Sequence, residues 1–184
     1  MITDRKSLKE YIKADNEYFM SYSAKTRMRL RITHDHLCVI KKFMFYLRME
    51  EYYHNKKGCC SRFLEFVYAR MKNRIGNKLG FYIRPNSLGK GVTIFHHGTI
   101  IVHGNARLGE NCKLHGDNCI GNNGITNDVP MIGNNVDIGF GAKIIGGIKI
   151  ADNVKIGAGA IVVKDCLHNG ATLVGIPAHE IKNK

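Results

Sequence analysis

Residues 132–163 read IGNNVDIGFGAKIIGGIKIADNVKIGAGAIVV, and an aliphatic side chain recurs in them at every sixth position. The same step can be followed through Val102, Leu108, Leu114, Ile120, Thr126, Ile132, Ile138, Ile144, Ile150, Ile156 and Val162. A repeat of six residues is typical of a parallel β-helix, in which each short strand turns one aliphatic side chain inward and successive coils stack. An α-helix is excluded, because steps of six residues would scatter the aliphatic side chains over several of its faces. A β-sandwich would not hold such a strict frame.

One step interrupts this frame. Leu88 and Ile94 are six residues apart, whereas Ile94 and Val102 are eight apart. Two additional residues therefore lie within Phe95–Ile101, the segment FHHGTII, which contains two adjacent histidines. An insertion on a regular scaffold changes the direction of its side chains, so we expect a functional site here.

The first eighty residues have a different composition. They hold 18 Lys and Arg against 8 Asp and Glu but only 3 of the 20 glycines, whereas the remainder holds 10, 7 and 17. Apolar spacing predicts helices over Ser7–Tyr18, Thr33–Tyr53 and Phe63–Met71. We therefore expect a mainly β fold, with a small N-terminal helical domain over residues 1–80. A β-helix domain with a C-terminal extension would follow over residues 81–184.

The net charge of +13 leaves three interpretations of the basic N-terminal segment. Long side chains can line a solvated helix face. The segment can instead make peripheral contact with anionic lipid or with an anionic substrate carrier. Nucleic acid is the weakest interpretation, because we recognise no nucleic-acid motif, and we expect no such partner.

The sequence contains no apolar run near the ~20 residues that span a bilayer. The charged segment Met1–Lys13 does not resemble a signal peptide. The six cysteines include no CxxC pair, which favours a reduced, cytoplasmic setting over a disulfide framework or a metal site.

From about Ile83 to Ala178 the sequence resembles the serine acetyltransferase-like branch of the hexapeptide-repeat acyltransferases. The pieces that carry the resemblance are IRPNSLGKGVTIFHHGTIIVHGNARLGENCKLHG at 83–116, the repeat at 132–163 and GIPA at 175–178. Within this branch it looks closest to short members found with cell-surface polysaccharide genes. The resemblance implies a left-handed β-helix and a homotrimer that binds acetyl-CoA in a groove between adjacent subunits, with no metal.

The family pattern of aliphatic, any, His, any, Gly matches residues 94–98 and places the catalytic general base at His96. His97 would take this role if the frame were off by one residue. His115 matches a second histidine common in the polysaccharide-type members, and we expect it to assist, although a structural role is the alternative. A neutral imidazole suits the removal of a hydroxyl proton near pH 7.

The resemblance also implies that backbone groups of the late coils bind the pantetheine arm of acetyl-CoA. These positions are Gly139, Gly141, Ala142, Gly157 and Ala158. Lys164 and Lys182 are candidates for phosphate contacts, and plain solubilising charge is the alternative.

Three positions depart from true serine acetyltransferases. Phe95 replaces an acidic residue before the histidine, Asp128-Val129-Pro130 replaces an Arg-His-Pro stretch, and Tyr82 replaces a carboxylate. In the family the first two sites contact the amino acid, and the carboxylate at the third orients the histidine. Because the amino-acid contacts are missing, we expect an acetyl-CoA-dependent O-acetyltransferase acting on a sugar hydroxyl of a cell-surface polysaccharide. The alternative is a serine O-acetyltransferase of cysteine biosynthesis.

A third hypothesis is a β-helix without catalytic activity, or a γ-carbonic-anhydrase-like metal enzyme. The latter would gather histidines from neighbouring subunits around a metal ion, with His96, His97, His103 and His115 as candidates.

Overall fold

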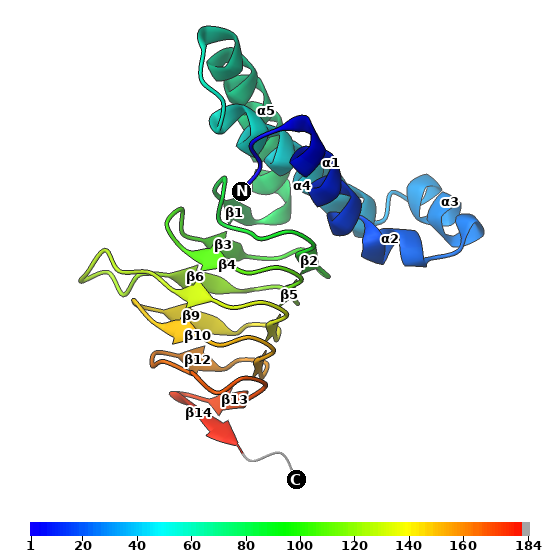
Figure 1. Cartoon of the computed structure of the whole chain (residues 1–184). Helices are drawn as coiled ribbons and strands as arrows, with labels where there is room; N and C mark the ends of the chain where they lie inside the picture. The colour runs from blue at the N-terminus through cyan, green and yellow to red at the C-terminus, as the bar shows by residue number, and fades with distance from the viewer. Residues whose placement is uncertain (182–184) are drawn as a thin grey trace.

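The computed structural model describes residues 1–181 and has helices at one end of a three-sided column of short strands (Figure 1). The helices of this described range are α1 (Arg5–Asp15), α2 (Glu17–Ser21), α3 (Ala24–Ile32), α4 (His36–His54) and α5 (Cys59–Leu79). None of them is both long and apolar enough to cross a bilayer.

Three sheets form the sides of the column. The first sheet contains β1 (Phe81–Ile83), β3 (Ile100–Val102), β6 (Cys119–Gly121), β9 (Lys143–Ile145) and β12 (Ile161–Val162). The second contains β4 (Arg107–Leu108), β7 (Met131–Ile132) and β10 (Lys149–Ile150). The third contains β2 (Thr93–Ile94), β5 (Lys113–Leu114), β8 (Asp137–Ile138), β11 (Lys155–Ile156), β13 (Thr172–Gly175) and β14 (Ala178–Ile181).

All strand pairs are parallel except β13 with β14, and the register stacks like residues. In the third sheet Ile94, Leu114, Ile138, Ile156 and Leu173 lie one above another, each 5% exposed or less. Burial of each such side chain contributes about 1.5–3 kcal/mol before conformational entropy is subtracted. One coil cannot bury these side chains alone, and stacked coils can.

The predicted frame is wrong at one step. Leu108 pairs with Ile132 and Val102 pairs with Ile120, so Ile120 and Ile132 are successive positions of one coil although twelve residues apart. Between Ile120 and Ile132 the chain contains six inserted residues. Because this is the length of one repeat, the spacing of six in the sequence is not disturbed. Thr126 is therefore an exposed residue of a loop, residues 122–130, that projects from the column (Figure 1).

The predicted interruption after Ile94 is confirmed. Ile94 pairs with Leu114 and Val102 pairs with Ile120, so the upper coil has two more residues than the lower one between these pairs. The additional residues lie in the turn that contains His96 and His97, between β2 and β3.

Three of the helices in the described range begin at side-chain caps, and the helices differ in part from the prediction. The Asp4, Ser23 and Asp35 side chains accept hydrogen bonds from backbone N–H groups at the starts of α1, α3 and α4. The predicted helix over Ser7–Tyr18 is divided between α1 and α2. The charge-rich α3 was not predicted, because it buries no side chain and has no apolar face.

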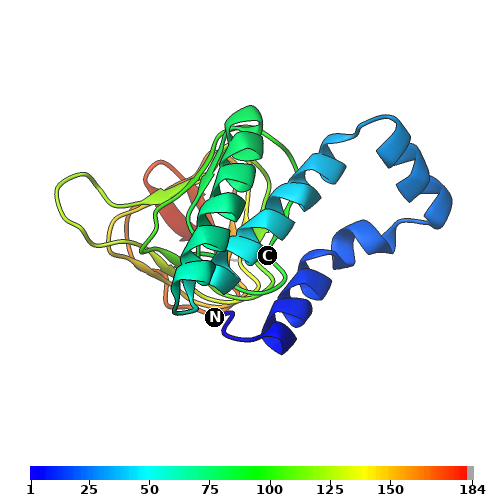
Figure 2. The ribbon, with the colours of Figure 1, turned by 90° about the horizontal axis from the view of Figure 1, so that it is seen from above.

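Helices α4 and α5 lie across the end of the column (Figure 2). Phe43 and Leu47 of α4 belong to the same apolar core as Phe81 and Ile83 of β1, and each is at most 6% exposed. Gly80, with φ of 80°, ends α5 and turns the chain into β1. The boundary near residue 80 matches the change from helix to strand, while the division into two domains stays a prediction.

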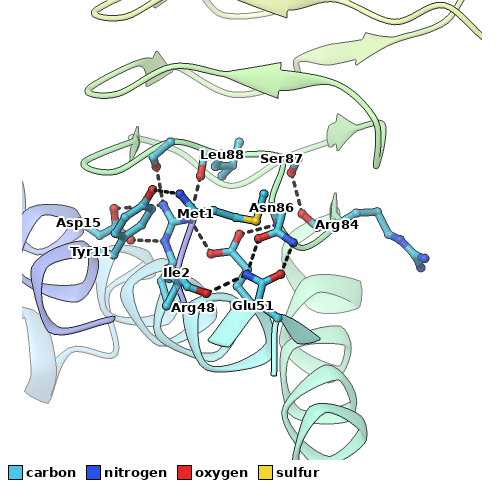
Figure 3. Close-up of polar contacts among 12 residues, drawn as sticks. Met1, Ile2, Tyr11, Asp15, Arg48, Glu51, Arg84, Asn86, Ser87 and Leu88 are labelled. Atoms are coloured by element: carbon cyan, nitrogen blue, oxygen red, sulfur yellow. Dashed lines mark hydrogen bonds and ion pairs between the residues drawn. The ribbon is translucent and has the colours of Figure 1, made fainter. Parts of the chain in front are cut away.

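A buried arginine joins the helices to the first coil (Figure 3). Arg48 of α4 is fully buried and binds Asp15 of α1 at 2.7 Å and Glu51 at 2.9 Å. Its guanidinium also donates to the carbonyl oxygens of Leu88 and Gly89. Burial by itself would lower the pKa of Arg48, but the charges of Glu51 and Asp15 outweigh burial and raise it. The helical segment is thus held to the column by a paired charge as well as by apolar packing.

Candidate active site

The candidate residues gather along one edge of the column, where strands of the third sheet turn toward the first sheet. The turns after β2, β5, β8 and β11 contain residues 95–99, 115–118, 139–142 and 157–160, and parallel register stacks them. We call these four turns the His–Gly edge. His96, His115, Gly139 and Gly157 therefore share one edge, although more than sixty residues separate the first from the last.

Three imidazoles meet at the upper end of this edge, and one of them comes from the helical segment. His36, the first residue of α4, stacks on His96 and His97 with ring centroids 5.7 and 5.4 Å apart. We call His36, His96 and His97 the three-histidine cluster. His96 and His97 are exposed, and their ring nitrogens have no hydrogen-bond partner within residues 1–181. Either ring is free to meet a substrate, and sequence reasoning placed both correctly in the irregular turn.

His36 was missed by sequence reasoning. Its Nε2 lies 3.2 Å from the carbonyl oxygen of Phe95, and its Nδ1 lies 3.4 Å from the carboxylate of Asp35. A carbonyl oxygen only accepts, so Nε2 carries the proton in this contact. The sole sequence signal was its place next to Asp35, which caps α4.

Phe95 fills the centre of the site. Its ring contacts His115 at a centroid distance of 4.7 Å and meets Tyr18 edge-on at 5.0 Å. The Tyr18 hydroxyl shares a 2.7 Å hydrogen bond with Tyr22. This bond, together with burial, raises the pKa of Tyr18 to about 12, so the phenol stays protonated. Phe95 therefore gives the site an apolar wall where the family resemblance led us to look for a carboxylate.

His115 has a carboxylate partner from the next coil. Its Nε2 lies 2.8 Å from Asp137 Oδ1, and both side chains are about one-third exposed. Asp137 occupies the strand position stacked on Lys113, which precedes the histidine by two residues. Sequence reasoning missed this pair, because the inserted loop places the two coils 24 residues apart instead of the usual 18.

Phe140 was also missed. A Cβ added to Gly116 would lie 3.2 Å from the Phe140 ring and 3.5 Å from His96 Cβ, so these three residues are neighbours. The Phe140 side chain is 52% exposed, and its ring lies beside the turn that contains Gly116. Gly116, with φ of 118°, leaves room for this ring.

The predicted cofactor positions differ in whether their backbone N–H and C=O groups are available to a ligand. Gly139, Gly141 and Gly157 use their N–H groups in bonds between coils, and Ala142 is fully buried. Ala158 is exposed, and neither its N–H nor its C=O has a partner in the described part of the chain. Ala158 is thus the position at which an extended ligand could add backbone hydrogen bonds.

The predicted phosphate contacts lie elsewhere. Lys164 lines a cavity of about 760 Å³ at the C-terminal end of the column, together with His168 and His179. It follows β12, so within one chain it belongs to a different edge from the His–Gly edge. Lys182 lies outside the described residues.

Comparison with known proteins gives a consistent group of relatives. No protein-family model matches the chain. The chain is 36% identical over 119 residues to a serine acetyltransferase of Synechococcus elongatus, covering 62% of this chain and 48% of the relative. It is 33% identical over 123 residues to one of Staphylococcus epidermidis, covering 65% and 57%. The chain thus spans about half the length of the curated relatives it matches.

A solved structure extends the similarity to the helices. Neisseria gonorrhoeae serine acetyltransferase matches with a TM-score of 0.71 and 25% identity, over 96% of this chain and 68% of that one. The match supports the predicted fold class, a left-handed parallel β-helix with an N-terminal helical region. A particular closeness to polysaccharide-type members is not shown. By sequence and by fold, the chain is similar to serine acetyltransferases of the hexapeptide-repeat type.

Proposed function

We propose that this protein is an acetyl-CoA-dependent O-acetyltransferase in which His96 is the general base. The observation that carries the proposal is the His–Gly edge, which has an exposed, unpartnered imidazole at one end and the unpaired backbone of Ala158 further along. The relatives support this reaction class, because they are named serine acetyltransferases. Brucella abortus serine acetyltransferase, which matches with a TM-score of 0.69, was solved in complex with coenzyme A.

The chemistry needs a base, a thioester held nearby and a dry contact surface. His96 would accept the proton of the acceptor hydroxyl as its oxygen attacks the thioester carbonyl. The C–S bond then breaks, and the imidazolium returns the proton to the departing thiolate. General-base catalysis of this kind contributes about 10²–10⁴-fold, and co-binding along one edge supplies the proximity. Phe95 and Phe140 would exclude water beside the reacting atoms.

Serine is the first candidate for the acceptor. The curated relatives are serine acetyltransferases, and a Neisseria gonorrhoeae relative was solved in complex with serine. These relatives favour serine, the alternative acceptor of the sequence analysis, over the sugar hydroxyl that we expected first. The sugar hydroxyl of a cell-surface polysaccharide remains a second candidate for one reason. The aromatic Phe95 and the apolar Val129 offer no charge to an amino acid, and a sugar ring packs well on an aromatic face.

The proposal includes a homotrimer in a reducing, cytoplasmic setting. The loop 122–130 leaves the column between the first and second sheets, so it is not on the His–Gly edge of its own chain. In a trimer a neighbouring subunit could bring its loop to this edge and close the site. The cysteines of the described range are all free, which agrees with a reducing setting.

The test is a thiol-release assay with acetyl-CoA and a panel of acceptors. The panel contains L-serine, D-serine, free sugars and nucleotide sugars, and His96→Ala is the inactive control. Release that depends on L-serine supports a serine acetyltransferase. Thiol release with sugars but not with serine supports the sugar hydroxyl as the acceptor. If none of the acceptors in the panel supports thiol release, O-acetyl transfer to these hydroxyls is contradicted.

A further inference from the structure

A second concave site lies on the helical segment, away from the His–Gly edge. Helices α2 and α3 form an arm beside α4 (Figure 2). Between the arm and α4 is a cavity of about 370 Å³, which we call the α3–α4 pocket. Its lining includes the cations Arg31, Lys41 and Lys42 and the aromatic rings of Phe19, Phe45 and Tyr46.

The pocket is separate from the catalytic edge because it uses the other face of α4. Ile40, Phe43 and Leu47 of this helix are buried against the column. Successive residues of a helix are rotated by about 100°, so Lys42 and Phe45 lie on the opposite side. A ligand in the α3–α4 pocket therefore does not compete with groups bound at His96.

The cations of the pocket are not neutralised by the protein. Within residues 1–181, no carboxylate lies within 4.0 Å of Arg31, Lys41 or Lys42. Burial lowers the pKa of Lys41, and repulsion by the nearby charge of Arg31 lowers it further. A bound anion would relieve this repulsion.

Contacts within the protein shape the pocket. Arg27 donates to the carbonyl oxygens of Met20 and Tyr22 and so fixes α3 against the end of α2. The Lys41 ammonium lies 4.5 Å from the centre of the Phe19 ring, which is buried and forms the floor. No residue of α3 is buried, so Arg31 is not part of the core and its guanidinium faces the pocket rim.

The chemistry of the lining indicates the ligand. A guanidinium matches the oxygens of a phosphate with two parallel hydrogen bonds, and lysines add point charge. Three cations suit the charge of about −2 on a phosphate ester better than that of one carboxylate. The exposed ring of Phe45, 41% accessible, would pack on the group attached to the phosphate.

We propose that the α3–α4 pocket binds the phosphate of an organic phosphate, with the adjoining ring or acyl group on Phe45 and Tyr46. The phosphate can belong to a soluble nucleotide or to the phosphomonoester headgroup of a lipid, and both present a terminal phosphate to these cations. The proposal does not depend on the acetyltransferase function.

The test compares two double substitutions that remove equal charge from this segment. Arg31→Gln with Lys42→Gln removes two cations of the pocket, and Lys25→Gln with Arg29→Gln removes two cations of α3 outside its lining. Full-length protein is titrated with uridine diphosphate by calorimetry. It is also sedimented with phosphatidylcholine vesicles that contain or lack phosphatidic acid, whose headgroup is a phosphomonoester. Circular dichroism and the KM for acetyl-CoA monitor the fold and the catalytic edge.

We expect the pocket variant to bind one of these probes at least about tenfold more weakly, and the control variant to stay within about twofold of wild type. Binding of uridine diphosphate assigns the pocket to a soluble ligand, and binding of vesicles with phosphatidic acid alone assigns it to a headgroup. Equal weakening in both variants would show that only net charge matters. That result, or a wild-type protein that binds neither probe, overturns the proposal.

Discussion

The imidazole of His36, at the start of α4, lies 3.2 Å from the carbonyl oxygen of Phe95 and stacks on the ring of His96. This contact joins the helical segment to the irregular turn of the column. It fixes the backbone immediately before the proposed base. The helices thus contribute to the site directly, and the arrangement of His96 depends on a residue sixty positions earlier.

A substitution at His36 should therefore slow catalysis without weakening cofactor binding. We expect His36→Ala to lower kcat by about tenfold, since it removes the hydrogen bond and the ring that orient His96. The KM for acetyl-CoA should not change. His36→Gln, whose amide can still donate to Phe95, should recover part of the rate. An unchanged kcat in His36→Ala would show that the contact does not position the base.

The pair of His115 and Asp137 gives a second prediction. The carboxylate selects the proton position on the His115 ring, since it accepts from Nε2 at 2.8 Å. Asp137→Asn should lower kcat by about tenfold or more and alter the pH–rate profile, because an amide no longer favours one tautomer. Glu110→Gln, a carboxylate change on another edge, is the matched control. Equal rates for both variants would assign His115 a structural role.

The position of Ala158 tests the cofactor path. Ala158→Glu places a negative charge and additional volume where the proposal puts the extended arm of acetyl-CoA. The KM for acetyl-CoA should rise by about tenfold or more, while the melting temperature stays near that of wild type. Val163→Glu changes another exposed residue of the same coil and should leave this KM unaffected. A KM that rises only in Val163→Glu would move the cofactor to a different edge.

The buried arginine predicts a large stability effect. Arg48→Met leaves the carboxylates of Asp15 and Glu51 unpaired between the helices and the first coil. Breaking a buried ion pair in this way costs about 3–5 kcal/mol. Denaturant unfolding should show this loss. By contrast, Arg62→Met, at an exposed position that forms no ion pair within residues 1–181, should change the free energy of unfolding by less than about 0.5 kcal/mol. Near-equal stabilities would mean that apolar packing alone holds the helices.

The column could be predicted because its physics is local and repeated. Every sixth residue from Val102 to Ile120 and from Ile132 to Val162 faces the core, and this spacing can be recognised from the sequence alone. The irregular turn was visible for the same reason, as a departure from the count. Thr126 was misassigned, because an insertion of one repeat length cannot be distinguished from the repeat by counting.

The rest of the site depends on contacts between distant segments. His36 reaches the turn only because α4 packs across the end of the column, and no spacing in the sequence reports that packing. Asp137 meets His115 through stacking of coils whose offset was hidden by the loop 122–130. Helix α3 was not predicted, since it has no buried face and its only local signal is the Ser23 cap.

The central claim is that the unpartnered ring of His96, and not that of its neighbour, takes the proton of the acceptor. The direct measurement is the rate of thiol release by His96→Ala and His97→Ala, with coenzyme A binding followed by calorimetry. We expect kcat to fall by about 10²–10⁴-fold in His96→Ala, with coenzyme A affinity retained, and by less than about threefold in His97→Ala. A His96→Ala protein that binds coenzyme A and keeps the wild-type rate would contradict the account.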